Sequence, residues 1–382
     1  MRSPLCVGLD LREVSESRGR YRRTMRLAYE LDRLDSGSRY ELFAESTPLV
    51  TRHEWSERSR IVSPSRVLRA MRRPILGHLR TALWGEAQVM HFLTGDCWEA
   101  PTCKTVVTIH DLAPLHFPEL FFEGGNRERR YLEHLNRIFR VADRVTTVSD
   151  FTQSEILERF PASRGKLQRI YPGVDPEFFP EDWGVQDRRW FREKIGAPDG
   201  FILSCVESEG CKRLGFLLEA YRIFRERSGS KRRLLVVGEN GSPKRGMEPV
   251  RDTVARLGLE DSVLFSGWIS DPFLRRHYCS ASLFVYPSKG EGFGYAPLEA
   301  MACGCPVLCS KASALPEIVG DAAHLLAPDD PSAWAEAMEA LLNDNDRRRE
   351  WVERGKVRSA PFRWERTAEE FLEVYALTAL RV

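Results

Sequence analysis

Short apolar runs and longer amphipathic segments take turns along most of the chain. The short runs are rich in β-branched and aliphatic residues, as buried parallel strands are, and the longer segments carry apolar residues at helical spacing. The strand-like runs include residues 5–9, 104–109, 144–148, 201–206, 234–241 with its glycine-rich exit, the strand and loop 263–269, and 281–286, and the helical segments include 22–34, 214–226, 331–343 and 364–380. This alternation predicts an α/β fold built on parallel sheets.

The alternation is interrupted once, between residues 172 and 198, where Pro, Gly, Asp, Trp and Phe accumulate and periodicity is weak. At 382 residues the chain exceeds what one hydrophobic core usually supports. We therefore expect two domains, over residues 1–175 and 198–360, with a linker over 176–197 and a C-terminal helical segment over 361–382.

Composition narrows the function classes. A net charge of +2, from 57 basic and 55 acidic residues, argues against a dedicated nucleic-acid binder. No apolar run approaches the ~20 residues of a membrane span, so a soluble, cytoplasmic protein is expected. The nine cysteines fit reduced thiols. Although Cys303, Cys305 and Cys309 lie close in sequence, their spacing favours core packing over a zinc site, and no metal is expected.

The most informative stretch runs from Ser288 to Val307 and follows the apolar run 281–286. Its glycines, at 290, 292 and 294, permit close backbone approach to a ligand, and Pro297 suits a first helical turn. The unpaired amides of such a turn bind anions such as a diphosphate. The flanking carboxylates of Glu291 and Glu299 are suited to accept hydrogen bonds from sugar hydroxyls. This layout predicts a nucleotide-sugar site.

The same stretch, Glu-Gly-Phe-Gly from Glu291 and Pro-Leu-Glu-Ala-Met-Ala-Cys-Gly-x-Pro-Val from Pro297, resembles the signature of the retaining glycosyltransferases of family 4, group 1. The resemblance covers nearly the whole chain and implies the GT-B fold: two Rossmann-like parallel-sheet domains facing each other across a cleft. The first domain would serve the acceptor and the second the nucleotide sugar, and the C-terminal helix would cross back to the first.

The resemblance also implies roles for individual residues. His110 would contact the reacting sugar or acceptor, Lys212 would hold the donor diphosphate, and Glu291 would bind sugar hydroxyls; these are the catalytic candidates. Glu299 would bind the ribose hydroxyls. The full set of implied substrate contacts is Gly19, Arg20, Asp111, Gly267, Trp268, Phe293, Gly294, Pro297, Leu298 and Glu299, with Arg213 as a further phosphate contact.

The implied reaction is metal-independent, hexosyltransferase-like transfer with retained anomeric configuration, in polysaccharide, lipopolysaccharide or other glycoconjugate assembly. Its substrates would be a nucleotide-diphosphate sugar and a glycan, lipid-linked or small-molecule acceptor, with no cofactor. Val206, Glu207 and Cys211 depart from the family pattern beside Lys212. They favour an alternative, a catalytically impaired GT-B scaffold or nucleotide-binding protein. A sugar-nucleotide epimerase on the same fold is a third reading.

A basic, partly amphipathic segment runs from residue 66 to 84. Its arginines are Arg66, Arg69, Arg72, Arg73 and Arg80. Such a face can sit on anionic lipid headgroups, which would place the enzyme at the inner face of a membrane beside a lipid-linked acceptor. A solvated helix packed on the sheet is the alternative. The sequence does not predict the sugar, the base or the acceptor.

Overall fold

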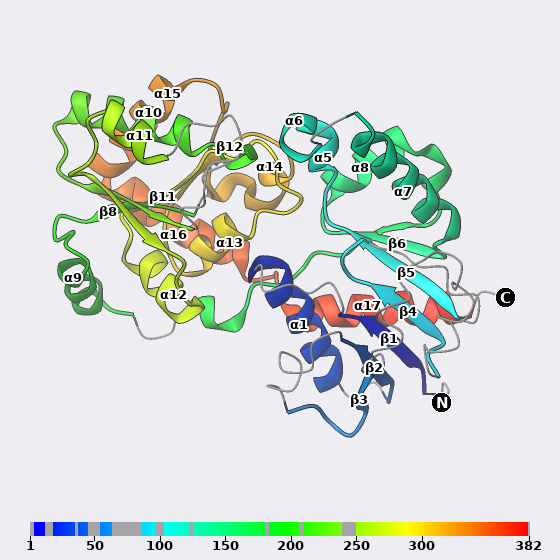
Figure 1. The fold of residues 1–382 in the computed structure, drawn as a ribbon. Helices are drawn as coiled ribbons and strands as arrows, with labels where there is room; N and C mark the ends of the chain where they lie inside the picture. The colour runs from blue at the N-terminus through cyan, green and yellow to red at the C-terminus, as the bar shows by residue number, and fades with distance from the viewer. Residues whose placement is uncertain are drawn as a thin grey trace. The chain divides into compact units, whose positions relative to one another are not determined.

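The computed structural model describes residues 4–11, 18–34, 37–44, 54–62, 86–95, 103–122, 125–179, 183–205, 210–238 and 250–380, with the side chains of 18–23 left out. The chain divides into two compact units, each treated by itself (Figure 1). Unit 1 holds Met1–Leu115, Phe122–Gly173 and Phe362–Val382. Unit 2 holds His116–Phe121 and Val174–Pro361. The stretch expected as a linker, 176–197, therefore lies in unit 2, where it contains the helix α9 (Val185–Lys194).

Unit 1 is built on a parallel sheet with the strand order β3-β2-β1-β4-β5-β6-β7. These strands are β1 (Cys6–Asp10), β2 (Arg39–Phe43), β3 (Ser59–Val62), β4 (Val89–Phe92), β5 (Lys104–Ile109), β6 (Arg144–Thr147) and β7 (Leu167–Arg169). Its helices are α1 (Arg18–Arg33), most of α5 (Ala113–His116), α7 (Arg127–Val141), α8 (Asp150–Arg159), the 3-10 turn η2 (Pro161–Ser163) and α17 (Trp364–Ala379). The β-branched run of β5 is buried throughout except at its first residue, as a central parallel strand requires.

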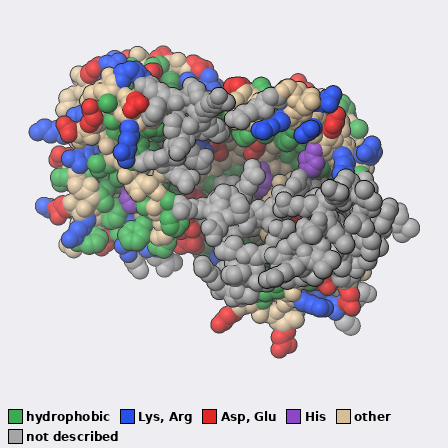
Figure 2. Space-filling view, in the orientation of Figure 1, with side chains coloured by type: hydrophobic (Ala, Val, Ile, Leu, Met, Phe, Trp, Pro, Cys, Tyr) green, Lys and Arg blue, Asp and Glu red, His purple; other side chains and the backbone are tan. Residues whose placement is uncertain are grey.

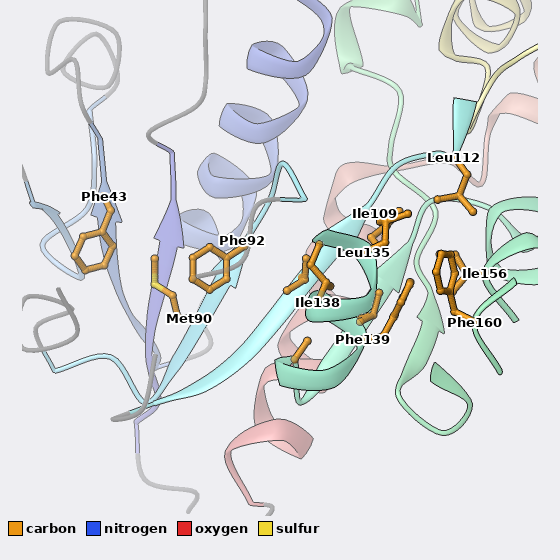
Figure 3. Packing of buried hydrophobic residues seen from close by; sticks show 13 residues of the cluster. Phe43, Met90, Phe92, Ile109, Leu112, Leu135, Ile138, Phe139, Ile156 and Phe160 are labelled. Carbon is orange, nitrogen blue, oxygen red and sulfur yellow. The ribbon is translucent and has the colours of Figure 1, made fainter. Parts of the chain in front are cut away.

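Helices α7 and α8 cover one side of this sheet through a shared apolar cluster. Leu135, Ile138 and Phe139 of α7, at helical spacing, pack with Ile156 of α8 and with β4 and β5 (Figure 3). Figure 3 shows these side chains gathered between helix and strands. The apolar stripe of α7 therefore fixes that helix on the sheet.

Unit 2 is built on a second parallel sheet with the order β10-β9-β8-β11-β12-β13. Its strands are β8 (Phe201–Cys205), β9 (Arg233–Val237), β10 (Val263–Gly267), β11 (Leu283–Tyr286), β12 (Val307–Ser310) and β13 (His324–Leu326). Its helices and 3-10 turns, besides α9, are α6 (Pro118–Phe121), η3 (Pro176–Phe178), η4 (Gly210–Lys212), α10 (Leu214–Ser228), α11 (Val250–Arg256), α12 (Asp271–Ser280), α13 (Tyr295–Ala302), α14 (Leu315–Val319), η5 (Gly320–Ala322), α15 (Pro331–Asn343) and α16 (Asn345–Ser359).

Both sheets reverse their strand order once. In unit 1 the order runs outward in two directions from the neighbouring pair β1 and β4, and in unit 2 from the pair β8 and β11. Ligands of open α/β sheets bind outside the carboxyl ends of the strands at such a reversal, because the two following loops diverge there. The β8–α10 and β11–α13 loops are therefore the expected ligand loops of unit 2.

The C-terminal helix α17 is part of unit 1. Its buried residues, which include Trp364, Phe371 and Tyr375, recur at helical spacing, and the helix packs against α1, β4 and β5. The first turns of α17 contact residues 171–173, which end the part of unit 1 that precedes Val174. There the Thr367 hydroxyl donates to the Tyr171 carbonyl at 2.8 Å. A Cβ added to Gly173 would lie 2.2 Å from the backbone nitrogen of Trp364. Gly173 therefore permits the close approach of two backbones.

Gly173→Ala should destabilise unit 1 by about 3 kcal/mol, because both clashing partners are backbone and neither can rotate away. Urea denaturation should show the loss as a lower midpoint. The matched control is Gly215→Ala, at a helical position where an added Cβ meets nothing within 4 Å. It should leave the midpoint unchanged or raise it, because alanine favours helix. Equal midpoints for the two variants would contradict the close-packed junction.

The drawn face carries side chains of both charges (Figure 2). On the face drawn in Figure 2, basic and acidic side chains are interspersed over the described parts of the chain, in keeping with the balanced composition. None of the helices in the described ranges combines the length and the apolar character of a bilayer crossing. Within the same ranges, no three His, Cys, Asp or Glu side chains are grouped to hold a metal ion.

Candidate functional site

The carboxylate of Glu291 is held in one orientation at the end of β11. The hydroxyls of Tyr286 and Ser288 donate to the same oxygen, Oε1, at 2.6 and 2.9 Å. The backbone N–H of Glu291 donates to Ser313 Oγ at 2.9 Å, and Ser313 itself has a left-handed backbone, φ +50°. Because both side-chain donors converge on Oε1, the second oxygen of Glu291 can accept hydrogen bonds from a ligand. Burial and the Glu291 charge raise the pKa of Tyr286 well above its ordinary value, so its hydroxyl remains a donor.

Glu299 is the most deeply buried carboxylate of the predicted site, with 3% exposure on the helix α13. The Tyr278 hydroxyl of α12 donates to its Oε2 at 3.3 Å and also lies 3.5 Å from the Cys205 sulfur at the end of β8. Burial raises the pKa of Cys205 to about 12, with Lys212 among the charges that act on this thiol. These contacts link α13 to the carboxyl end of β8 through Tyr278 and Cys205. The charge of Lys212 acts on the same thiol.

The glycine loop of the predicted motif is shaped by two different constraints. Gly294 caps α13 in a left-handed conformation, φ +104°, that disfavours any residue with a Cβ. At Gly290 the constraint is close packing, because an added Cβ would lie 2.6 Å from the Phe117 ring. Helix α13 begins at Tyr295, two residues before Pro297, so Pro297 and Leu298 both fall in its first turns. Phe293 is buried against the Tyr295 ring, with centroids 4.7 Å apart.

The two cations predicted beside the phosphate take different positions in the β8–α10 loop. Lys212 ends the 3-10 turn η4, and Arg213 follows as the residue before α10. The Arg213 guanidinium donates to the Pro328 carbonyl and lies 3.6 Å from the carboxylate of Asp329. The charge of Lys212 acts on the Cys205 thiol at the end of β8, while Arg213 is directed to the loop before α15. Val206 and Glu207 lie outside the described residues.

Gly267 and Trp268, the predicted base-reading pair, lie at the carboxyl end of the edge strand β10. Gly267 has a left-handed backbone, φ +65°, and its carbonyl accepts from the Gly238 N–H at 3.2 Å. The Trp268 side chain is 53% exposed. The pair thus lies on the same edge of the sheet as Lys212 and Glu291, because all strands of this sheet are parallel.

His110 follows β5 of unit 1 and lies beside the reversal of that sheet. Its Nε2 is 2.9 Å from the Leu93 carbonyl, at the end of β4. Because a carbonyl only accepts, Nε2 carries a hydrogen in this contact. The carboxylate of Asp111 accepts from the Ala113 N–H at 3.0 Å, at the start of α5.

Several predicted residues cannot be placed. Gly19 and Arg20 belong to the first turn of α1, where side chains are outside the described set. The five arginines of the predicted membrane face, Arg66, Arg69, Arg72, Arg73 and Arg80, lie outside the described residues altogether. The membrane contact therefore stays a hypothesis.

The sequence did not single out the residues that hold the two glutamates. Tyr278 is 21 positions from Glu299, and Ser313 is 22 from Glu291. Tyr286 and Ser288 carried a signal, since hydroxyls flank Glu291 at the end of a strand, but their convergence on Oε1 depends on the loop's path.

Comparison with known proteins identifies the family. Residues 187–358 match the family described as Glycosyl transferases group 1, and residues 22–178 match the one described as Glycosyltransferase Family 4. A D-inositol 3-phosphate glycosyltransferase of Kineococcus radiotolerans is 30% identical over 308 residues, which cover 76% of this chain and 69% of that protein. The chain belongs to the group 1 glycosyltransferases.

Two further relatives are mannosyltransferases by their names. The serotype-specific mannosyltransferase WbdA of Escherichia coli is 31% identical over 271 residues, 71% of this chain. This chain spans about a third (33%) of the length of that protein. The O-antigen chain mannosyltransferase B of Escherichia coli is 29% identical over 274 residues, 72% of this chain and 70% of that protein.

Solved structures show that this glycosyltransferase has the GT-B fold. The Anabaena protein Alr3699/HepE, crystallised with UDP and glucose, superposes with a TM-score of 0.77 at 17% identity, covering 98% of this chain and 100% of that chain. A glycosyltransferase from Rickettsia africae superposes with a TM-score of 0.79, also at 17% identity, over all of both chains (100% each). The predicted fold class, two parallel-sheet α/β domains of the GT-B type, is confirmed.

Proposed function

We propose that this protein is a retaining, metal-independent glycosyltransferase. It moves a sugar from a nucleotide-diphosphate sugar to a glycan, lipid-linked or other small-molecule acceptor in polysaccharide or glycoconjugate biosynthesis. One observation carries the proposal: a cation and two carboxylates, both held by hydrogen bonds, follow the two neighbouring strands at the break in strand order of unit 2. Lys212 follows β8, while Glu291 and Glu299 follow the neighbouring strand β11. Family membership supports the same conclusion, as do relatives that are named mannosyltransferases and a neighbour crystallised with UDP and glucose.

The described residues divide the work as follows. Lys212 and the first turn of α13 bind the diphosphate, whose negative charge grows as the bond to the sugar breaks. Glu299 accepts hydrogen bonds from the ribose, and the oriented carboxylate of Glu291 accepts from sugar hydroxyls. His110 contacts the reacting sugar or acceptor. Catalysis then rests on positioning and on stabilisation of the leaving group.

Binding and turnover test this proposal separately. UDP, GDP and ADP are titrated by calorimetry, and the matching nucleotide sugars are assayed for nucleoside-diphosphate release with and without candidate acceptors. We expect one base to bind best, and acceptor to accelerate release. Tight binding with no turnover on any sugar would instead support a nucleotide-binding scaffold. No binding of any of the three would contradict the proposal.

Retention of the anomeric configuration and independence of metal are each tested by a separate measurement. Proton NMR of the first product formed should show the same anomeric configuration as the donor, and an inverted product would refute retention. Turnover in excess EDTA should equal turnover with added Mg²⁺ or Mn²⁺. A requirement for metal would refute the metal-independent reading.

A further inference from the structure

An ion cluster joins three loops at the carboxyl edge of the unit 2 sheet. The carboxylate of Asp329, between β13 and α15, lies 2.5 Å from Lys289 Nζ and 3.6 Å from the Arg213 guanidinium. The hydrogen bond from Lys289 lowers the pKa of Asp329, so the carboxylate is charged at neutral pH. Two cations thus share the carboxylate of Asp329, and the charge of Glu219 also acts on Arg213.

The backbone at Arg213 is unusual. Among the described residues, Arg213 and Ser313 are the non-glycine positions with positive φ, and Arg213 has φ 56° and ψ 51°. A residue with a Cβ disfavours this conformation, which persists only when surrounding contacts hold it. Those contacts are the Pro328 carbonyl, Asp329, and the Phe216 ring, whose centroid is 4.4 Å from the guanidinium carbon. Ser313, the other such residue, positions Glu291.

The cluster adjoins the proposed diphosphate site. The backbone N–H of Lys289 donates to the Cys211 carbonyl at 2.7 Å, which ties the β11–α13 loop to the residue before Lys212. Lys289 also lies two positions before Glu291. Lys212, Arg213 and Lys289 therefore form a group of cations on the two loops at the strand reversal. A diphosphate needs several such cations, because one lysine cannot balance its charge.

We propose that Lys289 is a further donor-binding residue of the diphosphate subsite, and that Asp329 is an internal counterion which the diphosphate displaces. Asp329 suits this exchange, because its side chain is 66% exposed and can be solvated once released, whereas Lys289 is 34% exposed. Release of Asp329 also removes this counterion from Arg213, whose guanidinium keeps its hydrogen bond to the Pro328 carbonyl. The inference rests on the proposed function, since it extends the same donor site.

Three variants test the exchange by calorimetry, with inorganic pyrophosphate and with UDP, GDP and ADP as probes. Lys289→Gln should weaken binding of pyrophosphate and of the preferred nucleotide about fivefold or more, and Asp329→Asn should tighten both about three- to fivefold. In Lys289→Gln/Asp329→Asn most of that gain should disappear, because the counterion acts through Lys289. The gain should also shrink at high ionic strength.

Glu336→Gln is the matched control. It removes one carboxylate of an exposed ion pair in the same unit, to Arg227 at 3.0 Å, with 59% exposure. It should leave all affinities unchanged. If Asp329→Asn leaves affinity unchanged or weakens it while the wild type binds nucleotide and turns over, this inference alone is overturned, and the cluster is a structural clamp. If the wild type binds no nucleoside diphosphate, the proposed function fails and this inference fails with it.

Discussion

Glu299→Gln is expected to reduce kcat/KM for transfer by about 10- to 150-fold while the protein stays folded. A carboxylate that accepts two ribose hydroxyls makes two charge-assisted hydrogen bonds, each worth about 1.5–3 kcal/mol. Glutamine keeps the volume of the buried side chain but offers one acceptor oxygen, so it cannot accept both hydroxyls. It can still accept from the Tyr278 hydroxyl, which lies 3.3 Å from the carboxylate, so the fold should tolerate the change.

The assignment to the ribose can be separated from a general loss of the site. Affinity for inorganic pyrophosphate should be unchanged in Glu299→Gln, because pyrophosphate has no ribose. The substitution should reduce the affinity for a nucleotide that lacks the 2′ or 3′ hydroxyl less than it reduces the affinity for the parent nucleotide. Glu336→Gln, an exposed carboxylate of the same unit, should retain wild-type kinetics. Full turnover by Glu299→Gln would remove Glu299 from the donor site.

The elements of the proposed donor site are local features, and the sequence predicts them. The predicted strand 281–286 contains β11 (Leu283–Tyr286), and the glycine loop follows it. The helix α13 ends at Ala302, before Gly304. Each signal lies within a few residues of the structure that it specifies, because strand burial and helix termination are set by neighbouring side chains.

The contacts that fix the site are not local, so pattern reasoning missed them. Tyr278 reaches Glu299, and Ser313 reaches Glu291, only because the sheet places β12 next to β11 and packs α12 beside α13. Strand order is decided by how crossover helices pack, and it leaves no mark on the spacing of any one segment. The same reason explains why His116–Phe121, in the first half of the sequence, belongs to unit 2, where Phe117 packs on Gly290.

The second large effect expected is acid destabilisation through His91, a fully buried residue of β4. Its Nδ1 lies 2.7 Å from the Tyr375 hydroxyl of α17, and its Nε2 lies 2.7 Å from Thr108 Oγ1. The Thr108 hydroxyl is in turn hydrogen-bonded to the Thr146 hydroxyl at 2.7 Å. The neutral ring thus links the C-terminal helix to β4, β5 and β6 by a buried chain of hydrogen bonds, and its side chain has no solvent to stabilise a charge.

Burial lowers the pKa of His91 from 6.5 to about 3, with a smaller contribution from the charge of His110. The unfolded chain keeps the ordinary value, so it binds a proton below pH 6.5 that the folded protein does not. Above pH 6.5 the titration of His91 therefore does not reduce the free energy of unfolding. This free energy should fall by about 1.4 kcal/mol for each pH unit below that value, until the folded pKa is reached. Between neutral pH and about pH 4.5, His91 alone would cost the fold about 3 kcal/mol.

Urea denaturation at a series of pH values measures this loss as a slope. His91→Gln should lower stability at neutral pH, because the amide cannot reproduce both ring contacts, yet it should flatten the acid slope by about 1.4 kcal/mol per pH unit. The difference between variants is the readout, since burial also lowers the pKa of His277 in unit 2 and adds its own acid sensitivity. His116→Gln, on α5 and outside the buried chain, should keep the wild-type slope. An unchanged slope in His91→Gln would mean that the ring admits a proton in the folded state, and that the link between α17 and the sheet survives its charging.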